Sequence, residues 1–210
     1  ASRSPQKGDL FFTFQGSFIM KFYRFPVGML QTNCYILSCP DTKKAVIVDP
    51  GAEPDKIEEL LEKEALEPLM IINTHGHYDH IGCNSYFRKK GIPVAIHAAD
   101  AQLMQDGGGS SWMGLPAETN AAPDILLEEG SIIEFGNEKI EVLFTPGHTP
   151  GHIALLHREG KKVFSGDSLF FRSIGRTDLP GGDYDLLLET LNEKFLSLPD
   201  DTEVFPGHGP

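Results

Sequence analysis

Short apolar runs separated by turn-forming residues dominate the first half of the chain. Residues 33–38 (NCYILS) and 44–51 (KAVIVDPG) predict two strands of a hairpin, because the CPDTK segment between them supplies turn residues. Residues 53–66 carry apolar side chains near helical spacing and acidic residues in the first turn, which predicts a surface helix. Residues 69–74 (LMIINT) are too short an apolar run for a helix and predict a buried strand.

The next segments alternate between helix-like and strand-like patterns. Residues 84–91 predict a helix that ends at a glycine, residues 93–97 a strand, and residues 98–106 another helix. Residues 106–124 have no periodicity and many turn formers, so they predict a long loop, which in a compact domain is usually functional or mobile.

The second half repeats this arrangement. It predicts strands at residues 131–135, 139–145, 152–157, 162–167 and 202–207, with a helix at 184–198. Two sheets with helices outside them would bury all of these runs. The pattern therefore predicts an α/β fold with four layers in the order α/β/β/α.

Composition limits the number of domains. A chain of 210 residues with 40% hydrophobic residues can bury one sizeable core, so we expect a single domain. Residues 1–19 do not read as a secretory signal, and Met20 resembles a natural start. We interpret residues 1–19 as vector-derived sequence or an extra N-terminal strand, and residues 20–210 as the domain.

Charge and cysteine content exclude several classes of partner. The formal net charge of −12 argues against a nucleic-acid partner, since binding phosphates requires a basic face. Cys34, Cys39 and Cys83 are an odd number without CxxC spacing, which favours a reducing cytoplasm over a disulfide framework. No apolar run approaches the roughly 20 residues of a membrane-spanning helix.

A dense cluster of potential metal ligands follows the strand predicted at 69–74. His75, His77, Asp79 and His80 lie within six positions, and the first two are two apart rather than four, as in the helical HExxH motif. This spacing predicts an extended loop, in which His80 faces another direction unless the chain turns. Two metals side by side would use both directions.

Three further segments each place glycine and a ligand-type residue after a strand. They offer His148 and His152 in TPGHTPGH, Asp167 in FSGDSLF, and His208 in VFPGHGP. Histidine and carboxylate ligands suit zinc, iron or manganese. The chain thus contains enough ligands for two coordination shells.

Five motifs together resemble the metallo-β-lactamase superfamily over the whole chain from Met20: VDPG (48–51), THGHYDH (74–80), TPGH (145–148), GD (166–167) and PGH (206–208). The resemblance implies a four-layer αββα sandwich. It implies that His75, His77 and His148 bind one metal and that Asp79, His80 and His208 bind the other. Asp167 would bridge the two metals, and Asp49 would orient a ligand histidine without binding metal.

The same resemblance implies a hydrolase with two divalent metals, most often zinc, with iron or manganese also compatible. A metal-bound hydroxide would be the nucleophile, held in a site to which Asp79 and Asp167 contribute. An aspartate at the bridge, where several β-lactamases have cysteine, points to the glyoxalase II side. The GRTDLPGGD segment (175–183) is similar to short glyoxalase II-like proteins and implies a small-molecule thioester substrate such as S-lactoylglutathione.

Three residues are candidates for substrate contact. Arg176 either contacts substrate or holds a turn with Asp178, and His152 either contacts substrate or hydrogen-bonds within its loop. Trp112, beside the glycines at 107–109, predicts a mobile flap over the substrate.

Several alternatives remain open at this stage. Full-length glyoxalase II enzymes continue past the last ligand histidine into a helical subdomain that binds glutathione, whereas this sequence ends at Pro210. A persulfide dioxygenase of the same fold would use one iron held by His75 or His77, His148 and Asp167. A tRNA-processing nuclease is disfavoured by the charge, and a non-catalytic binding module by the intact ligand set. Oligomeric state is not predicted.

Overall fold

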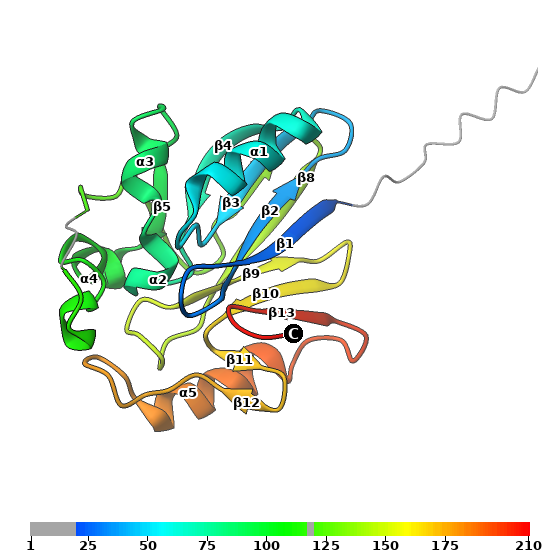
Figure 1. Cartoon of the computed structure of the whole chain (residues 1–210). Helices are drawn as coiled ribbons and strands as arrows, with labels where there is room; N and C mark the ends of the chain where they lie inside the picture. Colours follow the sequence, from blue (N-terminus) through cyan, green and yellow to red (C-terminus); the bar gives the residue numbers. More distant parts are fainter. Residues whose placement is uncertain (1–19, 117–119) are drawn as a thin grey trace, which may run out of the picture.

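Two β-sheets packed face to face form the centre of the computed structural model, which describes residues 20–116 and 120–210 (Figure 1). Within these residues the first sheet has the strand order β1-β2-β3-β4-β5-β6 and the second β13-β10-β9-β8-β7. The first sheet comprises Lys21–Val27 (β1), Thr32–Ser38 (β2), Lys44–Val48 (β3), Glu67–Ile72 (β4), Val94–His97 (β5) and Ile125–Leu127 (β6). The second comprises Ile132–Phe135 (β7), Glu138–Phe144 (β8), Ile153–His157 (β9), Lys162–Gly166 (β10) and Glu203–Pro206 (β13).

The space between the sheets forms the main hydrophobic core. Tyr35 and Leu37 of β2 point into it, whereas Cys34 and Ile36 of the same strand point to the outer face of the first sheet. Successive side chains of a strand alternate between faces. A strand that is apolar at every position, as β2 is, therefore needs a covering layer on both sides.

Helices provide these covering layers. On the first sheet, Ile57, Phe87 and Met104 each come from a different helix and join the outer cluster. On the second sheet, Phe195 packs with Leu156. The helical elements are Pro54–Glu64 (α1), Tyr78–Ile81 (α2), Asn84–Arg88 (α3), Ala98–Asp100 (η1), Ala101–Gln105 (α4), Ser110–Met113 (η2), Tyr184–Thr190 (α5) and Leu191–Phe195 (η3, a π-helical turn). The predicted four-layer α/β/β/α sandwich is confirmed.

Strand direction places several loops at one edge of the sandwich. β3, β4 and β5 are parallel to one another, so their carboxyl ends meet at the same edge of the first sheet. In the second sheet β8 and β10 are both antiparallel to β9, and β13 is parallel to β10. The carboxyl ends of β8, β10 and β13 therefore also meet. Crevices outside the carboxyl ends of strands are common ligand sites in α/β proteins.

The structure differs from the predicted elements mainly at edges and turns. β1 and β6 are not predicted, because β1 is an edge strand with alternating exposed residues and β6 has only three residues. A short hairpin, Leu169–Phe170 (β11) with Ser173–Ile174 (β12), is also missed. β4 begins and ends two residues before the predicted 69–74, and α3 ends three residues before the predicted 91. The predicted 33–38 and 44–51 hairpin is confirmed by antiparallel pairing of β2 with β3.

Some sequence-based expectations lie outside the described residues. These are the interpretation of residues 1–19 and the part of the predicted 106–124 loop at 117–119. In the described parts, no helix has the length and apolar character needed to cross a membrane.

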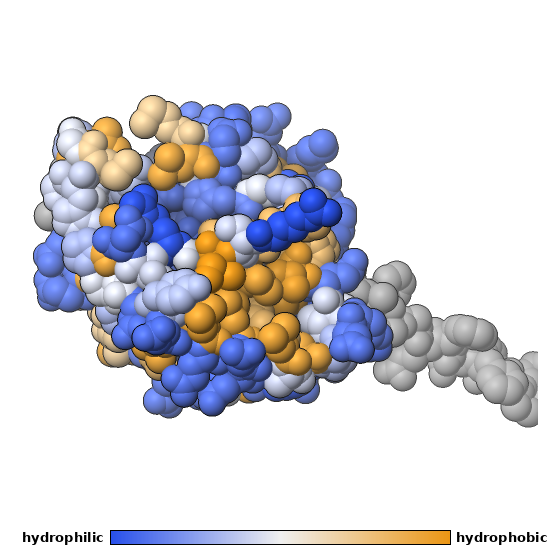
Figure 2. Space-filling view, turned by 90° about the horizontal axis from the view of Figure 1, so that it is seen from below, coloured by the Kyte–Doolittle hydropathy of each residue, from blue (hydrophilic) through white to orange (hydrophobic). Residues whose placement is uncertain are grey.

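An apolar patch lies on the outer face near η3 and β13, seen from below in Figure 2. Leu169, Leu196, Leu198 and Val204 line a surface depression of about 210 Å³ there. Leu196 is 76% exposed.

Candidate metal centre

All seven predicted metal ligands come together at the carboxyl ends of β4, β8, β10 and β13. They form three overlapping groups, and the ligand-type atoms of each group lie within 4.8 Å of one another. The groups are His75, His77 and His148; His75, His80 and Asp167; and Asp79, His80 and His208. Segments far apart in the sequence thus converge on one site, as the sequence analysis predicted.

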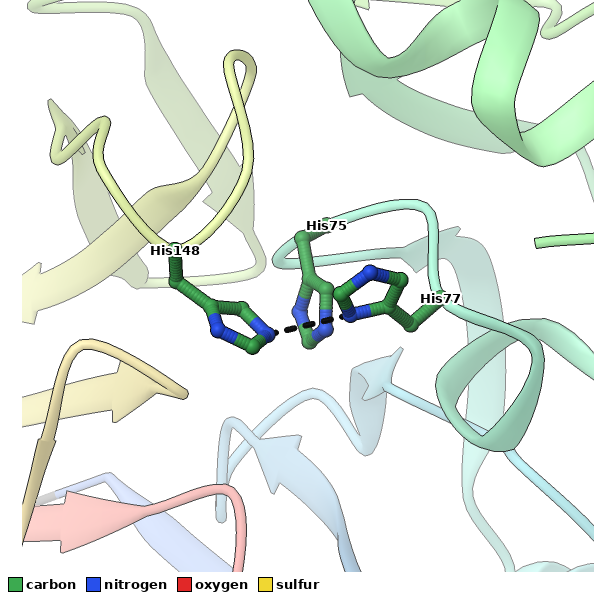
Figure 3. Close-up of side chains that lie close together, drawn as sticks. All are labelled: His75, His77 and His148. Atoms are coloured by element: carbon green, nitrogen blue, oxygen red, sulfur yellow. Dashed lines mark hydrogen bonds between the residues drawn. The ribbon is translucent and has the colours of Figure 1, made fainter. Parts of the chain in front are cut away.

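The first group consists of three imidazoles that face a common point (Figure 3). His77 Nδ1 lies 3.0 Å from His148 Nε2. The other nitrogen of His148, Nδ1, donates to the backbone carbonyl of Arg176 at 2.7 Å, so its Nε2 carries the lone pair in the neutral ring. His75 Nδ1 contacts Thr74 Oγ1 at 3.1 Å, and its Nε2 is buried without a hydrogen bond among the described residues. The contacts of His148 Nδ1 and His75 Nδ1 leave the Nε2 atom of each ring free to face the centre of the group.

The group of Asp79, His80 and His208, called the second group from here on, combines two imidazoles with one carboxylate. His208 Nε2 lies 3.2 Å and His80 Nε2 3.4 Å from Asp79 Oδ2. The opposite nitrogen of each ring is held from behind, His208 Nδ1 by the carbonyl of Leu30 at 3.1 Å and His80 Nδ1 by Asp49 Oδ2 at 3.0 Å. The group therefore offers two imidazole nitrogens and one carboxylate to a common point.

Asp167 lies between the two groups. Its Oδ2 is 3.7 Å from His148 Nε2 and 3.4 Å from His208 Nε2, and its Oδ1 is 3.6 Å from His80 Nε2. Asp167 Oδ1 is buried and has no hydrogen-bond partner in the described structure. The carboxylate thus contacts residues of both groups.

This donor set fits divalent metal ions. Ligand atoms about 2.0–2.1 Å from zinc in tetrahedral geometry lie about 3.3 Å apart. The facing atoms of His77 and His148 are 3.0 Å apart, and those of His208 and Asp79 are 3.2 Å apart. Buried nitrogens and oxygens without hydrogen-bond partners are otherwise costly. A bound cation would satisfy them.

The two groups differ in their electrostatics. Burial, together with the neighbouring histidines, lowers the pKa of His77 to about 3 and that of His75 well below its usual value. Burial also opposes protonation of His80, but the carboxylates of Asp79 and Asp167 raise its pKa to about 9. Despite its burial, Asp167 has its pKa lowered to about 2, chiefly by His80. Burial thus favours the neutral form of His75 and His77, whereas Asp167 is ionised.

The chain makes a turn between the two groups. His77 has extended backbone dihedrals, but the one-turn helix α2 begins at Tyr78 and carries Asp79 and His80. The predicted extended loop is therefore correct only as far as His77. This turn sends His80 toward Asp49, which also accepts hydrogen bonds from the Thr74 amide and hydroxyl at 2.7 Å each. Asp49 lies behind a candidate ligand histidine, as predicted, and belongs to none of the three groups.

Two glycines of the quoted motifs are required by close backbone approach. A Cβ on Gly51 would lie 1.6 Å from the carbonyl oxygen of Asp79, and a Cβ on Gly207 would lie 2.1 Å from Asp167 Oδ1. Neither position can hold a side chain without moving a candidate ligand residue. The glycines of VDPG and PGH thus have a direct spatial reason.

Sequence reasoning missed one buried carboxylate that joins two ligand-bearing loops. Asp100 accepts from the amide of Gly76, from Thr149 Oγ1 and from the amide of Gly151, at 2.8, 2.6 and 2.6 Å. Gly76 lies between His75 and His77, and Thr149 follows His148. The available signal was its position just after β5, at the same sheet edge as the candidate ligands.

Of the two roles weighed for His152, substrate contact and hydrogen bonding within its loop, its burial favours the second. Its side chain is fully buried, and Nε2 accepts from the Asp167 amide at 2.9 Å. Nδ1 contacts Thr145 Oγ1 at 2.8 Å and Ser168 Oγ at 3.1 Å. Both ring nitrogens are therefore used inside the protein, and His152 holds the backbone of Asp167, which is the loop role weighed against substrate contact.

A cavity of about 340 Å³ opens above the candidate metal ligands, and Arg176 and Trp112 both line it. Arg176 Nε and Nη2 bind the two carboxylate oxygens of Asp178 at 2.7 Å each, which is the predicted turn. Trp112 is 43% exposed, and its ring centroid lies 6.2 Å from that of His77. Both residues are in a position to meet a ligand, and their contact with substrate stays a prediction.

Comparison with known proteins gives a consistent assignment. The sequence profile described as the metallo-beta-lactamase superfamily matches residues 27–208. The protein named probable metallo-hydrolase YqgX of Bacillus subtilis is 42% identical over 194 residues, which cover 91% of each chain. Hydroxyacylglutathione hydrolase GloC of Haemophilus influenzae is 36% identical over 188 residues, which cover 88% of each chain.

Solved structures agree with the described fold. The BLEG-1 B3 metallo-beta-lactamase is 41% identical, with a TM-score of 0.85 over 90% of this chain and 92% of that one. TTHA1623 in a di-iron-bound form is also 41% identical, with a TM-score of 0.80 and the same coverage. These similarities extend over almost the whole described sandwich.

Proposed function

The chain belongs to the metallo-beta-lactamase superfamily and is a metal-dependent hydrolase of that superfamily, and we propose that it uses two metal ions to cleave a small-molecule thioester, for which S-lactoylglutathione is the reference substrate. His75, His77 and His148 would hold one ion, and Asp79, His80 and His208 the other. Asp167 would bridge them. We propose zinc as the metal. Iron is the alternative, because the similar protein TTHA1623 is solved in a di-iron-bound form.

The position of Asp167 carries the proposal of two metals. Its Oδ2 lies 3.7 Å from His148 Nε2 of one group and 3.4 Å from His208 Nε2 of the other, and its Oδ1 lies 3.6 Å from His80 Nε2. A site for one ion would leave the group of Asp79, His80 and His208 without a metal, and the buried His80 Nε2, which has no hydrogen-bond partner among the described residues, would stay unsatisfied. An unsatisfied buried polar atom is costly.

The net reaction adds water to the acyl carbon. The water oxygen bonds to the carbonyl carbon, the carbon–sulfur bond breaks, and a carboxylate, a thiol and a proton result. Bound divalent ions in such a site supply water activation and polarisation of the carbonyl group. The residues of this chain hold the imidazoles in fixed orientations through Thr74, Asp49 and the carbonyls of Arg176 and Leu30.

Two observations support a thioester. GloC, a hydroxyacylglutathione hydrolase by name, is similar over 88% of this chain. The GRTDLPGGD segment supplies Arg176, whose carbonyl orients His148 and whose side chain lines the cavity. We propose a small-molecule substrate and a cytoplasmic location. We propose no nucleic-acid partner, because a net charge of −12 disfavours binding to phosphates.

Hydrolysis of a β-lactam is a second candidate, and one observation favours it. A protein described as a B3 metallo-beta-lactamase has a TM-score of 0.85 and 41% identity to this chain. Hydrolysis of a cyclic amide, like that of a thioester, adds water to a carbonyl carbon. A chromogenic cephalosporin therefore belongs in the same assay.

The decisive experiment combines metal content with three reactions. Metal per chain is measured by inductively coupled plasma mass spectrometry, alongside hydrolysis of S-lactoylglutathione, hydrolysis of the cephalosporin, and oxygen uptake with glutathione persulfide. About two metals per chain with thioester cleavage is the expected result. One iron with oxygen uptake would replace the proposal with the persulfide dioxygenase alternative.

A matched pair of histidine variants sharpens this experiment. His208→Ala should lose one metal and most hydrolytic activity, because it removes a ligand of the second group. His97→Ala is the control, since its ring stacks on Phe144 at 4.4 Å outside the three groups. Full hydrolysis by His208→Ala with one metal bound would contradict a two-metal mechanism.

A further inference from the structure

The walls of the cavity above the candidate metal centre are apolar. Its floor contains candidate metal ligands, whereas the residues around it are large hydrophobic side chains from five separate segments. These are Leu30, Trp112, Met113, Phe170, Ile174 and Leu179. Leu30 is 46%, Trp112 43% and Met113 55% exposed, so apolar surface is available at the mouth. Exposed apolar surface around a polar site is typical of ligand binding.

Positive charge is scarce in the same cavity. Among the described lining residues, Arg176 is the one lysine or arginine, and both of its contacts go to the carboxylate of Asp178. Arg172, nearby in sequence, lies over the Phe171 ring at 5.1 Å and does not line the cavity. Asp79 and Asp167 of the floor belong to the candidate metal ligands, so the proposed metal ions are their partners.

A glutathione arm does not match these walls. It carries two carboxylates and one ammonium group, and each carboxylate that leaves water needs a cation or hydrogen-bond donors in return. An apolar arm would instead cover the exposed surfaces of Trp112 and Met113 and gain from their removal from water.

We infer that the thiol half of the natural substrate is apolar and uncharged, and that the walls formed by Trp112, Met113 and their neighbours select it. This inference rests on the proposed thioester hydrolysis, but not on the identity of the acyl group. It commits the apolar cavity to one occupant, the thiol arm of the substrate whose carbonyl lies over the candidate metal ligands.

The test uses three thioesters of the same lactoyl group, made from benzyl mercaptan, 2-mercaptoethanol and glutathione. kcat/KM is measured for each with the metal-loaded enzyme and divided by the rate of spontaneous hydrolysis. The benzyl thioester should exceed the other two by about tenfold or more, since a few buried carbon atoms can change specificity by that factor. The 2-mercaptoethanol thioester has an uncharged but polar arm. Its kcat/KM therefore distinguishes recognition of an apolar arm from rejection of a charged one.

Each other outcome has a distinct meaning. If the glutathione thioester is the best substrate, or if all three agree within about twofold, the inference is wrong and the thioesterase proposal stands. If the benzyl and 2-mercaptoethanol thioesters react equally, the apolar walls do not recognise the arm and the inference is also wrong. If metal is bound and none of the three thioesters is cleaved, the thioesterase proposal is wrong, and so is the inference that rests on it.

A pair of charge variants tests the wall directly. Met113→Lys places a cation at an exposed position of the wall and should lower the ratio of benzyl to glutathione kcat/KM by about tenfold. Leu196→Lys adds the same charge on the outer face, where the residue is 76% exposed, and should leave the ratio within about twofold. An unchanged ratio in Met113→Lys would overturn the inference.

Discussion

The carboxylate of Asp100 connects two loops that lie far apart in the sequence. It is fully buried, and it accepts three hydrogen bonds, from Gly76 on one loop and from Thr149 and Gly151 on another. These loops carry His75, His77 and His148. Asp100 touches none of the proposed ligands, so its effect on metal binding would come through the position of the backbone on either side of them.

Asp100→Asn should weaken metal binding. The amide group presents an NH₂ to one of the three donors that now meet a carboxylate, so at least one contact is lost and the loops separate. Loss of such a supporting contact typically lowers metal affinity by about 10–100-fold. The measurement is a Co²⁺ titration of the metal-free protein followed by its visible absorption.

Asp106→Asn is the matched control for this substitution. Asp106 is exposed, and its side chain accepts from Gln102 Nε2 at 2.9 Å at the end of α4 rather than from either loop. It should bind Co²⁺ as the wild type does. If Asp100→Asn also kept wild-type affinity and absorption while losing only thermal stability, the residue would have no role in positioning the metal ligands.

At the scale of elements, the glycine turn at 107–109 supports the histidine loop. All three glycines have positive φ, and the Gly108 carbonyl accepts from the Tyr78 amide at 3.0 Å. A Cβ on Gly108 would lie 2.3 Å from Tyr78 N and 2.7 Å from the carbonyl carbon of His77. The turn is thus pressed against the start of α2, where the chain changes direction between the two ligand groups.

Gly108→Ala should therefore reduce both stability and activity. A left-handed alanine alone costs about 1–2 kcal/mol, and the clash with the segment that carries His77 adds to this. Gly130→Ala isolates the first effect, because Gly130 has φ of +77° and nothing within 4 Å of its Cβ position. Urea unfolding and kcat are compared for the two. Equal losses of stability with unchanged kcat would show that the contact with the histidine loop is unimportant.

The predicted flap over the substrate involves the neighbouring 3₁₀ turn, η2. Trp112→Ala should raise KM for a thioester more than it lowers kcat, because the ring lines the cavity and packs edge to face on His77, with 6.2 Å between ring centroids, but belongs to none of the candidate ligand groups. Steady-state kinetics with the three lactoyl thioesters measure this, with Leu196→Ala as the control on another surface. Unchanged kcat and KM for every substrate would contradict both the predicted flap and the proposed role of Trp112 in the apolar wall of the cavity.

At the scale of the whole molecule, the centre joins the two sheets. His75, His77, Asp79 and His80 follow a strand of the first sheet, while His148, Asp167 and His208 follow strands of the second. The loops also share a backbone hydrogen bond from the Ile153 amide to the Thr74 carbonyl at 2.8 Å. Bound metal would therefore stabilise the packing of one sheet on the other.

Removal of metal should lower the melting temperature of the entire domain. A ligand present at 100 times its Kd stabilises the folded state by about 2.7 kcal/mol, and each kcal/mol shifts Tm by about 2–4 °C in a chain of this size. Scanning calorimetry with and without a chelator, checked for complete metal loss, measures the shift. A Tm unaffected by complete removal would mean that the sheets hold the ligand geometry without metal.

The sequence by itself determined the layers and the candidate ligands, because both are local patterns. Continuous apolar runs such as 33–38 require two covered faces, and glycine followed by histidine or aspartate after each strand marks the edge where strand ends meet. Only tertiary structure decided the rest. It buried His152 against the Asp167 amide, brought Asp100 between two loops, and gathered Leu30, Trp112 and Phe170 into one wall. These contacts join segments distant in sequence, so no local pattern specifies them before the sheets pack.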